Sequence, residues 1–301
     1  MMDSLNPFLY RITDMLNRFG IVVKPNKPDA ILLAKEIYSW LTERKCQVLL
    51  DEAMIGLIPR SPTFSRNAIC QSVDCLIVLG GDGTLLSAAR DLAAGPSQVP
   101  ILGVNLGGLG FLTEITLEEV YPVLERVLQG RVEIERRMRL RTKVFRQERA
   151  AGEYFVLNDV VITKSVLARI INLRNRIDSA YVSTYRGDGV IISTPTGSTA
   201  YSLAAGGPIV YPGMESILIT PICPHTLTNR PLLISDQATI EFILESEESD
   251  VSLTLDGQVG FPLSPFDRVV ITKAKEPVLF IKSPFKDYFE ILRTKLKWGE
   301  R

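Results

Sequence analysis

The chain has little of several residue types on which common functions depend: its 301 residues include one histidine and four cysteines. A Ser-His-Asp hydrolase would have to use His225, which lies in the turn Pro224-His225-Thr226, a place more typical of a structural residue. The four cysteines lack metal-ligand spacing, as is usual for the reduced thiols of a cytoplasmic protein. These shortages argue against hydrolase chemistry and against a cysteine-based metal site.

Long apolar runs and an excess of charge are also missing. No apolar stretch reaches the roughly 18 residues of a membrane helix, and the N-terminal segment has no signal-peptide core. Basic and acidic residues balance at 34 each, which argues against an electrostatic surface for nucleic acid. We therefore expect a soluble, cytoplasmic protein that binds neither membrane nor nucleic acid and whose partners are small molecules or copies of itself.

The most informative segment is CLIVLGGDGTLL, residues 75–86. It predicts a strand over residues 75–79, a glycine turn over residues 80–84 and a helix over residues 85–94. Glycines let backbone N–H groups approach an anion, and a helix N-terminus attracts the same charge, so the turn suits phosphate. Asp82 is the exception: a carboxylate here indicates a metal ion or a proton transfer, with a helix N-cap as the simpler alternative.

Neither common nucleotide fingerprint is present. Leu86 stands where Gly-x-Gly-x-x-Gly needs its third glycine, and the chain has no Gly-Lys dipeptide for a P-loop. Dinucleotide oxidoreductases and P-loop NTPases are therefore disfavoured.

Strands and helices alternate in the first half of the chain. Strands are predicted at 21–24, 47–50, 75–79 and 100–105, and helices at 29–45 and 85–94. Thr116 and Glu119 form a capping-box pattern for a helix to residue 129, although Pro122 requires that helix to start later or to kink. Repeated βα units predict a parallel sheet covered on both faces, with ligands at the carboxyl ends of its strands.

Short strand-like runs dominate from about residue 132, at 140–144, 154–162, 181–185, 189–193, 238–244, 251–255 and 268–272. We therefore predict an α/β N-terminal domain, residues 1–137, and a mostly β domain, residues 138–275. After a strand at 278–281, the helical pattern of residues 286–297 has Phe289, Leu292 and Leu296 on one face. This C-terminal helix, within residues 276–301, is expected to return to the first domain.

Four further segments are rich in residues that ligand sites use. They are the glycine loop at 103–112, Leu157-Asn158-Asp159-Val160, the small and hydroxyl residues of 186–208, and Leu255-Asp256-Gly257-Gln258. Asn158 and Asp159 interrupt an apolar run, so they either pin a turn or hold a ligand. Residues 255–258, taken alone, are a plain hairpin turn.

Together and in this order, these segments resemble the NAD kinase family. The GGDGT turn at 80–84 is shared with diacylglycerol and sphingosine kinases and, more loosely, with 6-phosphofructokinases, so the later segments carry the distinction. Further matches are PICPH at 221–225, NRP at 229–231 and the C-terminal SPFKDYFEILRTKL. Where family members often have Asn-Glu, this chain has Asn158-Asp159.

The resemblance implies transfer of the γ-phosphoryl group of ATP to the 2′-hydroxyl of the adenosine ribose of NAD, which gives NADP. Asp82 is the expected general base, because a ribose hydroxyl is a poor nucleophile. Mg²⁺ or another divalent cation is expected with the nucleotide and not on a protein metal site. The family also suggests a homo-oligomer, a dimer or a tetramer, with active sites near subunit contacts.

The resemblance extends to individual NAD- and nucleotide-binding positions. Tyr201 offers a face for stacking on adenine. The implied binding residues are Asp82, Gly83, Asn158, Asp159, Arg169, Arg186, Asp188, Thr199, Ala200, Tyr201, Ser202, Leu203, Ala204 and Gln258.

Two alternatives remain from the residues themselves. A lipid kinase would need an apolar acceptor pocket in place of the 199–204 segment. A catalytically silent NAD sensor is disfavoured by the presence of Asp82.

Overall fold

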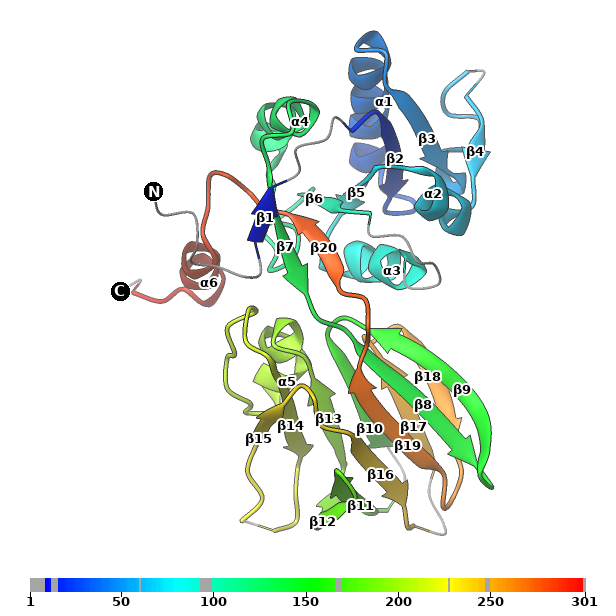
Figure 1. Ribbon diagram of the computed structural model, residues 1–301, viewed down its shortest axis with the longest axis vertical. Helices are drawn as coiled ribbons and strands as arrows, with labels where there is room; N and C mark the ends of the chain where they lie inside the picture. The colour runs from blue at the N-terminus through cyan, green and yellow to red at the C-terminus, as the bar shows by residue number, and fades with distance from the viewer. Residues whose placement is uncertain are drawn as a thin grey trace. The chain divides into compact units, whose positions relative to one another are not determined.

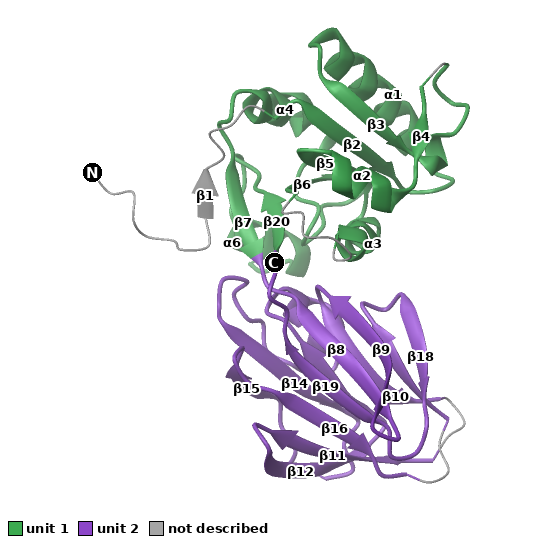
Figure 2. Cartoon of the chain, turned by 45° about the vertical axis from the view of Figure 1, so that its right-hand side comes forward, with its two compact units in different colours: residues 1–136, 278–301 green, residues 137–277 purple. Residues whose placement is uncertain are grey.

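The computed structural model describes residues 9–11, 16–59, 61–92, 99–165, 169–226, 228–246 and 250–299. The chain divides into unit 1, residues 1–136 with 278–301, and unit 2, residues 137–277 (Figure 2). The sequence led us to expect these divisions after residues 137 and 275. Unit 2 is thus inserted between two segments of unit 1.

Unit 1 contains an eight-stranded sheet in the order β1-β7-β20-β6-β5-β2-β3-β4. Strands β20, β6, β5, β2, β3 and β4 run parallel, whereas β1 pairs with β7 in the antiparallel sense. The bounds are β1 (Leu9–Arg11), β2 (Arg18–Val23), β3 (Gln47–Asp51), β4 (Thr63–Phe64), β5 (Cys75–Gly80), β6 (Ile101–Asn105), β7 (Glu133–Arg137) and β20 (Val278–Ile281). The predicted parallel sheet is confirmed.

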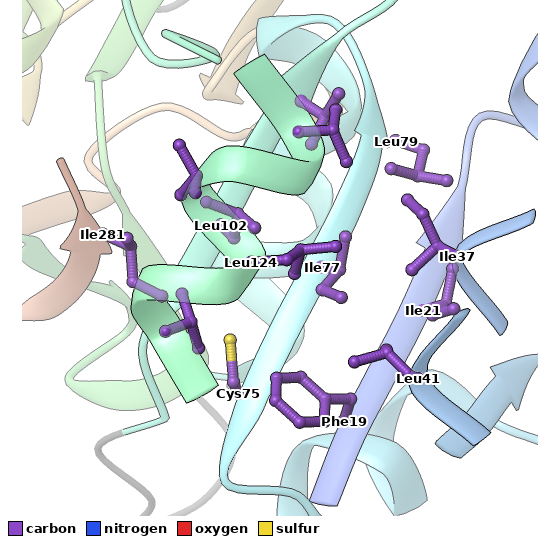
Figure 3. Close-up of a cluster of buried hydrophobic side chains, with 14 of the residues drawn as sticks. Phe19, Ile21, Ile37, Leu41, Cys75, Ile77, Leu79, Leu102, Leu124 and Ile281 are labelled. Atoms are coloured by element: carbon purple, nitrogen blue, oxygen red, sulfur yellow. The ribbon is translucent and has the colours of Figure 1, made fainter. Parts of the chain in front are cut away.

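Helices cover both faces of this sheet. Helices α1 (Pro28–Glu43) and α4 (Val120–Leu128) pack on one face, where Ile37 and Leu124 meet Cys75, Ile77 and Leu79 of β5 (Figure 3). The opposite face carries α2 (Arg66–Ser72) and α3 (Asp82–Leu92). There, a Cβ on Gly20 would lie 2.3 Å from Ile69 of α2, and one on Gly103 would lie 2.6 Å from Leu85 of α3. Glycine in β2 and β6 therefore allows the helices this close approach.

Several element boundaries differ from the sequence prediction. Helix α3 begins at Asp82 and not at Leu85, while the predicted end at Ala94 lies outside the described residues. Helix α2 was not predicted, because its seven residues are too short to establish a period. Helix α4 begins after a 3₁₀ turn, η2 (Leu117–Glu119), so Pro122 falls in its first turn, where no intrahelical N–H is needed.

The last helix, α6 (Tyr288–Leu296), belongs to unit 1, as predicted. Its buried residues are Ile291 and Leu292, whereas Phe289 is 55% exposed. The predicted face is therefore right for Leu292, which is buried, and for Leu296, which is partly buried, but wrong for Phe289. No helix in the described part of the chain is long and apolar enough to cross a membrane.

Unit 2 consists of two six-stranded antiparallel sheets, ordered β15-β14-β13-β10-β17-β18 and β12-β11-β16-β19-β8-β9. Side chains from both sheets form one hydrophobic cluster, so the sheets pack face to face (Figure 1). The strands are β8 (Leu140–Arg146), β9 (Arg149–Val156), β10 (Asp159–Lys164), β11 (Ile171–Ile177), β12 (Ala180–Gly187), β13 (Gly189–Ser193), β14 (Ser216–Ile222), β15 (Leu232–Ser235), β16 (Ile240–Leu244), β17 (Val251–Leu255), β18 (Val259–Leu263) and β19 (Arg268–Lys273). The mostly β character expected for this region is confirmed.

Candidate active site

The glycine segment after β5 is more helical than its sequence suggested. Gly80 is the last residue of β5 and Asp82 the first of α3, so Gly81 alone joins strand to helix. Asp82, Gly83 and Thr84 then form the first helical turn, which lies at the carboxyl end of a central parallel strand. This is the position at which ligands of such sheets are expected.

The Asp82 carboxylate is bound by the second glycine loop and does not cap α3. Its Oδ1 accepts hydrogen bonds from the N–H of Leu112 (3.2 Å), the N–H of Thr113 (3.0 Å) and the hydroxyl of Thr113 (2.9 Å). Its Oδ2 accepts one bond, from the N–H of Phe111 (2.9 Å). Among the described residues, Oδ1 thus accepts three hydrogen bonds and Oδ2 one, which leaves Oδ2 the less occupied of the two oxygens.

The loop after β6 is built around this carboxylate. Thr113, which is fully buried, accepts a hydrogen bond at its hydroxyl from Asn105 Nδ2 (2.7 Å), and Asn105 Oδ1 accepts the Gly107 N–H (2.7 Å). A Cβ on Gly110 would lie 2.2 Å from Asp82 Oδ1. Glycine at position 110 therefore allows the loop to close on Asp82, and the two glycine segments form one structure.

A cavity of about 290 Å³ opens beside Asp82. It is lined by Gly80 to Asp82, by residues of the 105–110 loop and by Lys24, Lys27 and Lys295. The sequence analysis missed these three lysines. Lys24 and Lys27 could have been found, because they follow β2 at the same sheet edge, but nothing in the sequence placed Lys295 of α6 there.

Carboxylates and other metal-ligating side chains are sparse in the described part of the candidate site. The described ranges contain no group of three or more histidine, cysteine, aspartate or glutamate side chains that could hold a metal ion. Asp82 is the one carboxylate that lines the cavity, and both of its oxygens accept bonds from the loop. A divalent cation at this site would therefore need oxygen ligands from a bound molecule.

In unit 2, Asp256 holds the turn between β9 and β10. Its carboxylate accepts the N–H groups of Leu157 (3.0 Å), Asn158 (2.7 Å) and Asp159 (3.2 Å). Asp256 and Gly257 adopt positive φ of 49° and 65°, which forms the tight hairpin between β17 and β18. The predicted single strand over 154–162 is therefore wrong: it breaks at Leu157-Asn158, where a buried carboxylate takes the backbone donors.

Two side chains of this turn have unusual environments. Asp159 is 4% exposed; burial, and then the negative charge of Asp256, raise its pKa to about 7. Asn158 Oδ1 is buried and has no hydrogen-bond partner among the described residues. Because an unpaired buried polar atom destabilises the fold, this oxygen is a candidate to accept a hydrogen bond from a ligand.

The run of small residues after β13 packs directly on the Asn158 turn. Thr194 donates its N–H to the Asn158 carbonyl (2.9 Å) and its hydroxyl to the Leu157 carbonyl (2.6 Å). A Cβ on Gly197 would lie 2.2 Å from the Asn158 carbonyl oxygen, so only glycine permits this contact.

The segment 199–204 follows as the end of a 3₁₀ turn, η3 (Thr196–Thr199), and helix α5 (Tyr201–Ala204). Tyr201 is 46% exposed and can offer its ring to a ligand. Ser202 is fully buried, and its hydroxyl bonds Thr220 (2.8 Å), so it serves packing.

The expected binding residues of unit 2 fall into two groups. The first group lies at the end of the sheet where Asp159 pairs with Ser193; it contains Asn158, Asp159, the 199–204 segment and the exposed Gln258. Asp188 lies at the other end of β10, where Thr163 pairs with Gly189, about 17 Å away along the strand. Arg186 of β12 and the exposed Arg169, just before β11, lie beside it, because Ile171 pairs with Gly187.

The remaining polar partners at this second end are local. Asp188 pairs with Lys164 (3.6 Å), and the Arg186 carbonyl accepts the N–H of His225 (2.8 Å). The one histidine thus contributes a backbone contact that fixes a turn.

Two family models match most of the chain: the ATP-NAD kinase N-terminal domain over residues 19–132 and the ATP-NAD kinase C-terminal domain over residues 157–283. The chain belongs to the NAD kinase family. Its members are kinases, so the chain is a phosphotransferase. The family matches distinguish this chain from the lipid kinases and phosphofructokinases that share the GGDGT turn, so the lipid-kinase alternative is not supported.

Curated relatives and solved structures agree. NAD kinases of Syntrophotalea carbinolica and Geotalea daltonii are each 50% identical to this chain, over 95% of it and 100% of the relative. Yeast NADH kinase complexed with NADH superposes with a TM-score of 0.87 at 27% identity, covering 96% of this chain and 89% of that one. An NAD kinase from Archaeoglobus fulgidus in complex with ATP gives a TM-score of 0.73 at 26% identity, covering 92% and 99%.

Proposed function

We propose that the chain transfers the γ-phosphoryl group of ATP to the 2′-hydroxyl of the adenosine ribose of NAD, forming NADP, with Asp82 as general base. The observation that supports this role is the lighter hydrogen bonding of Asp82 Oδ2, which accepts one bond from the described residues where Oδ1 accepts three, in a carboxylate that lines the glycine cavity. The three bonds to Oδ1 fix the orientation of the group. Oδ2 can then accept the hydroxyl proton as the new O–P bond forms and the bond from the γ-phosphorus to the bridging oxygen breaks, which releases ADP.

The donor phosphates are proposed to lie against Gly80, Gly81 and Gly83. A phosphate can approach the backbone closely at such residues, and the positive end of the α3 dipole points to the same place. A divalent cation supplies charge neutralisation when it arrives with the nucleotide. In this proposal, the reaction depends on a metal ion because the nucleotide brings it, and not because the protein holds it.

The acceptor nucleotide is proposed to bind at the Asn158 end of unit 2. The unpaired Asn158 Oδ1 can accept a hydrogen bond from the adenine amino group. Asp159 can bond ribose hydroxyls in either protonation state, because its pKa is raised to about 7. Tyr201 supplies an exposed ring for stacking, and Gln258 and residues 199–204 border the same turn.

Arg169, Arg186 and Asp188 are proposed to contact an NAD molecule held by a second copy of the chain. Within one chain these residues lie at the opposite end of β10 from Asn158. A homo-oligomer, as the sequence suggested, brings the two groups together without any rearrangement of the sheet. A cytoplasmic location stays a prediction from the sequence.

One assay tests the reaction. Purified protein incubated with ATP, Mg²⁺ and NAD should form NADP, and omission of any one of the three should stop it. Absence of NADP with folded protein would overturn the proposed function.

Mixing two inactive variants tests the shared site. Asn158→Ala keeps the backbone bonds to Asp256, and Asp188→Ala removes only a long, partly exposed ion pair with Lys164 (3.6 Å), so both variants should fold. After denaturation and joint refolding, mixed oligomers should contain sites with intact Asn158 and Asp188, and activity should return. Activity that stays absent in proven mixed oligomers would place both residues in one chain's site.

A further inference from the structure

Three lysines line the cavity beside Asp82, two from the segment between β2 and α1 and one from the last helix of the chain. Lys24 directly follows β2, Lys27 directly precedes α1, and Lys295 lies in the last turn of α6. We call them the cavity lysines. Asp82 is the one acidic residue in the lining, so positive charge is in excess there.

The cavity lysines differ in their surroundings from several other lysines of the chain. Lys164, Lys273 and Lys286 each pair with a carboxylate. Within the described ranges, no carboxylate oxygen lies within 4.0 Å of a cavity lysine. Their charges are therefore not neutralised by neighbouring side chains.

The contacts that the cavity lysines do make leave their charge available. Lys27 Nζ lies 3.4 Å from the Leu106 carbonyl oxygen, and Lys295 Nζ lies 5.6 Å from the centre of the Phe111 ring. A carbonyl and a ring face orient an ammonium group but carry no negative charge. Both contacts are made by the loop that Asp82 holds through the Phe111 N–H.

The rest of the lining indicates which anion these charges serve. Glycine backbone forms much of the wall, and the described lining residues include no aromatic side chain on which a base could stack. Such a surface recognises linked phosphates and not a nucleobase. We propose that Lys24, Lys27 and Lys295 bind the phosphate chain of the donor, an inference that rests on the kinase function proposed above.

This arrangement solves an electrostatic problem at the site. A general base must be ionised to accept a proton, and its charge repels the phosphates that have to approach it. The cavity lysines offset that repulsion on the side of the donor. Lys295 also makes phosphate binding depend on the last helix of the chain, since α6 carries it to the cavity.

The test replaces Lys27 and Lys295 one at a time with glutamine. Lys297→Gln is the matched control, because Lys297 directly follows the same helix, is exposed and is not among the residues that line the cavity. Each cavity variant should raise the KM for ATP by about tenfold, the size expected for one lost charge-assisted contact, and leave the KM for NAD within about twofold. Inorganic tripolyphosphate, titrated calorimetrically without NAD, should bind the control more tightly than either variant.

The outcomes separate the lysine proposal from the function on which it rests. If wild type forms NADP and both cavity variants keep its KM for ATP, the lysine proposal is wrong. Equal effects of Lys295→Gln and Lys297→Gln would also overturn it, because general charge would then explain the loss. If wild type forms no NADP, the proposed function fails, while weaker tripolyphosphate binding by the variants alone would still support the phosphate site.

Discussion

Replacing Asp159 with asparagine should stabilise the protein more and more as the pH rises. Burial, and then the charge of Asp256, raise the pKa of Asp159 from 3.8 to about 7 in the folded state. Because the folded-state pKa is the higher one, the proton on Asp159 stabilises the fold. This contribution is complete below about pH 3.8 and is lost as the pH rises through about 7. Above that range the wild type carries a buried charge that the variant lacks.

The size of the effect follows from the pKa shift. A rise from 3.8 to about 7 corresponds to about 4 kcal/mol between the two ends of the range. For a domain of this size, that difference amounts to roughly 10 °C in Tm. The asparagine keeps the shape of the side chain and the backbone bond from residue 159 to Asp256.

Urea unfolding of both proteins, followed by circular dichroism from about pH 4 to about pH 8, measures this difference directly. The variant should match the wild type at the acidic end and exceed it at the basic end. Asp250→Asn, which removes a charge from an exposed position in unit 2, is the matched control. A stability difference that stays constant with pH, or that the control reproduces, would refute the reasoning about Asp159.

Three further predictions concern catalysis, substrate binding and stability. Asp82→Asn should lower kcat by roughly 10² to 10⁴ with little change in NAD affinity, and near-normal turnover of the folded variant would remove Asp82 from the mechanism. Tyr201→Ala should raise the KM for NAD at least about tenfold and the KM for ATP far less, whereas equal changes in both would indicate loss of the whole site. Truncation after Lys282 removes buried Ile291 and Leu292, so unit 1 should melt at a lower temperature, and a chain that melts like the full-length protein would contradict this.

The parts of the fold that sequence predicts well are those with strong local signals. The bounds of β13, β17 and β20 were predicted to the residue, because the apolar runs there begin directly after aspartate or proline. The start of α3 was missed, because glycine and aspartate usually favour turns, and here the carboxylate is occupied by a distant loop. The break between β9 and β10 was missed for a related reason: Asp256, far along the chain, supplies the acceptor.

The candidate site shows the same division. Asp82, Asn158 and Asp159 stand out as polar residues among glycine or apolar neighbours, so composition alone identifies them. The separation of Asp188 from Asn158 follows from strand register, which short motifs do not encode. Lys295 was missed because a lysine in an amphipathic helix is ordinary, and only the return of α6 to unit 1 gives it a role.

The position of β20 has a consequence for synthesis on the ribosome. In the sheet of unit 1, β20 lies between β7 and β6, yet it follows all of unit 2 in the chain (Figure 1). The nascent chain therefore holds a complete unit 2 while the first sheet still has a gap between two of its strands. Unit 1, although it begins first, can be completed only when its last 24 residues, 278–301, have emerged. Until then, the edges of β6 and β7 that face the gap are unpaired and open to pairing with other chains.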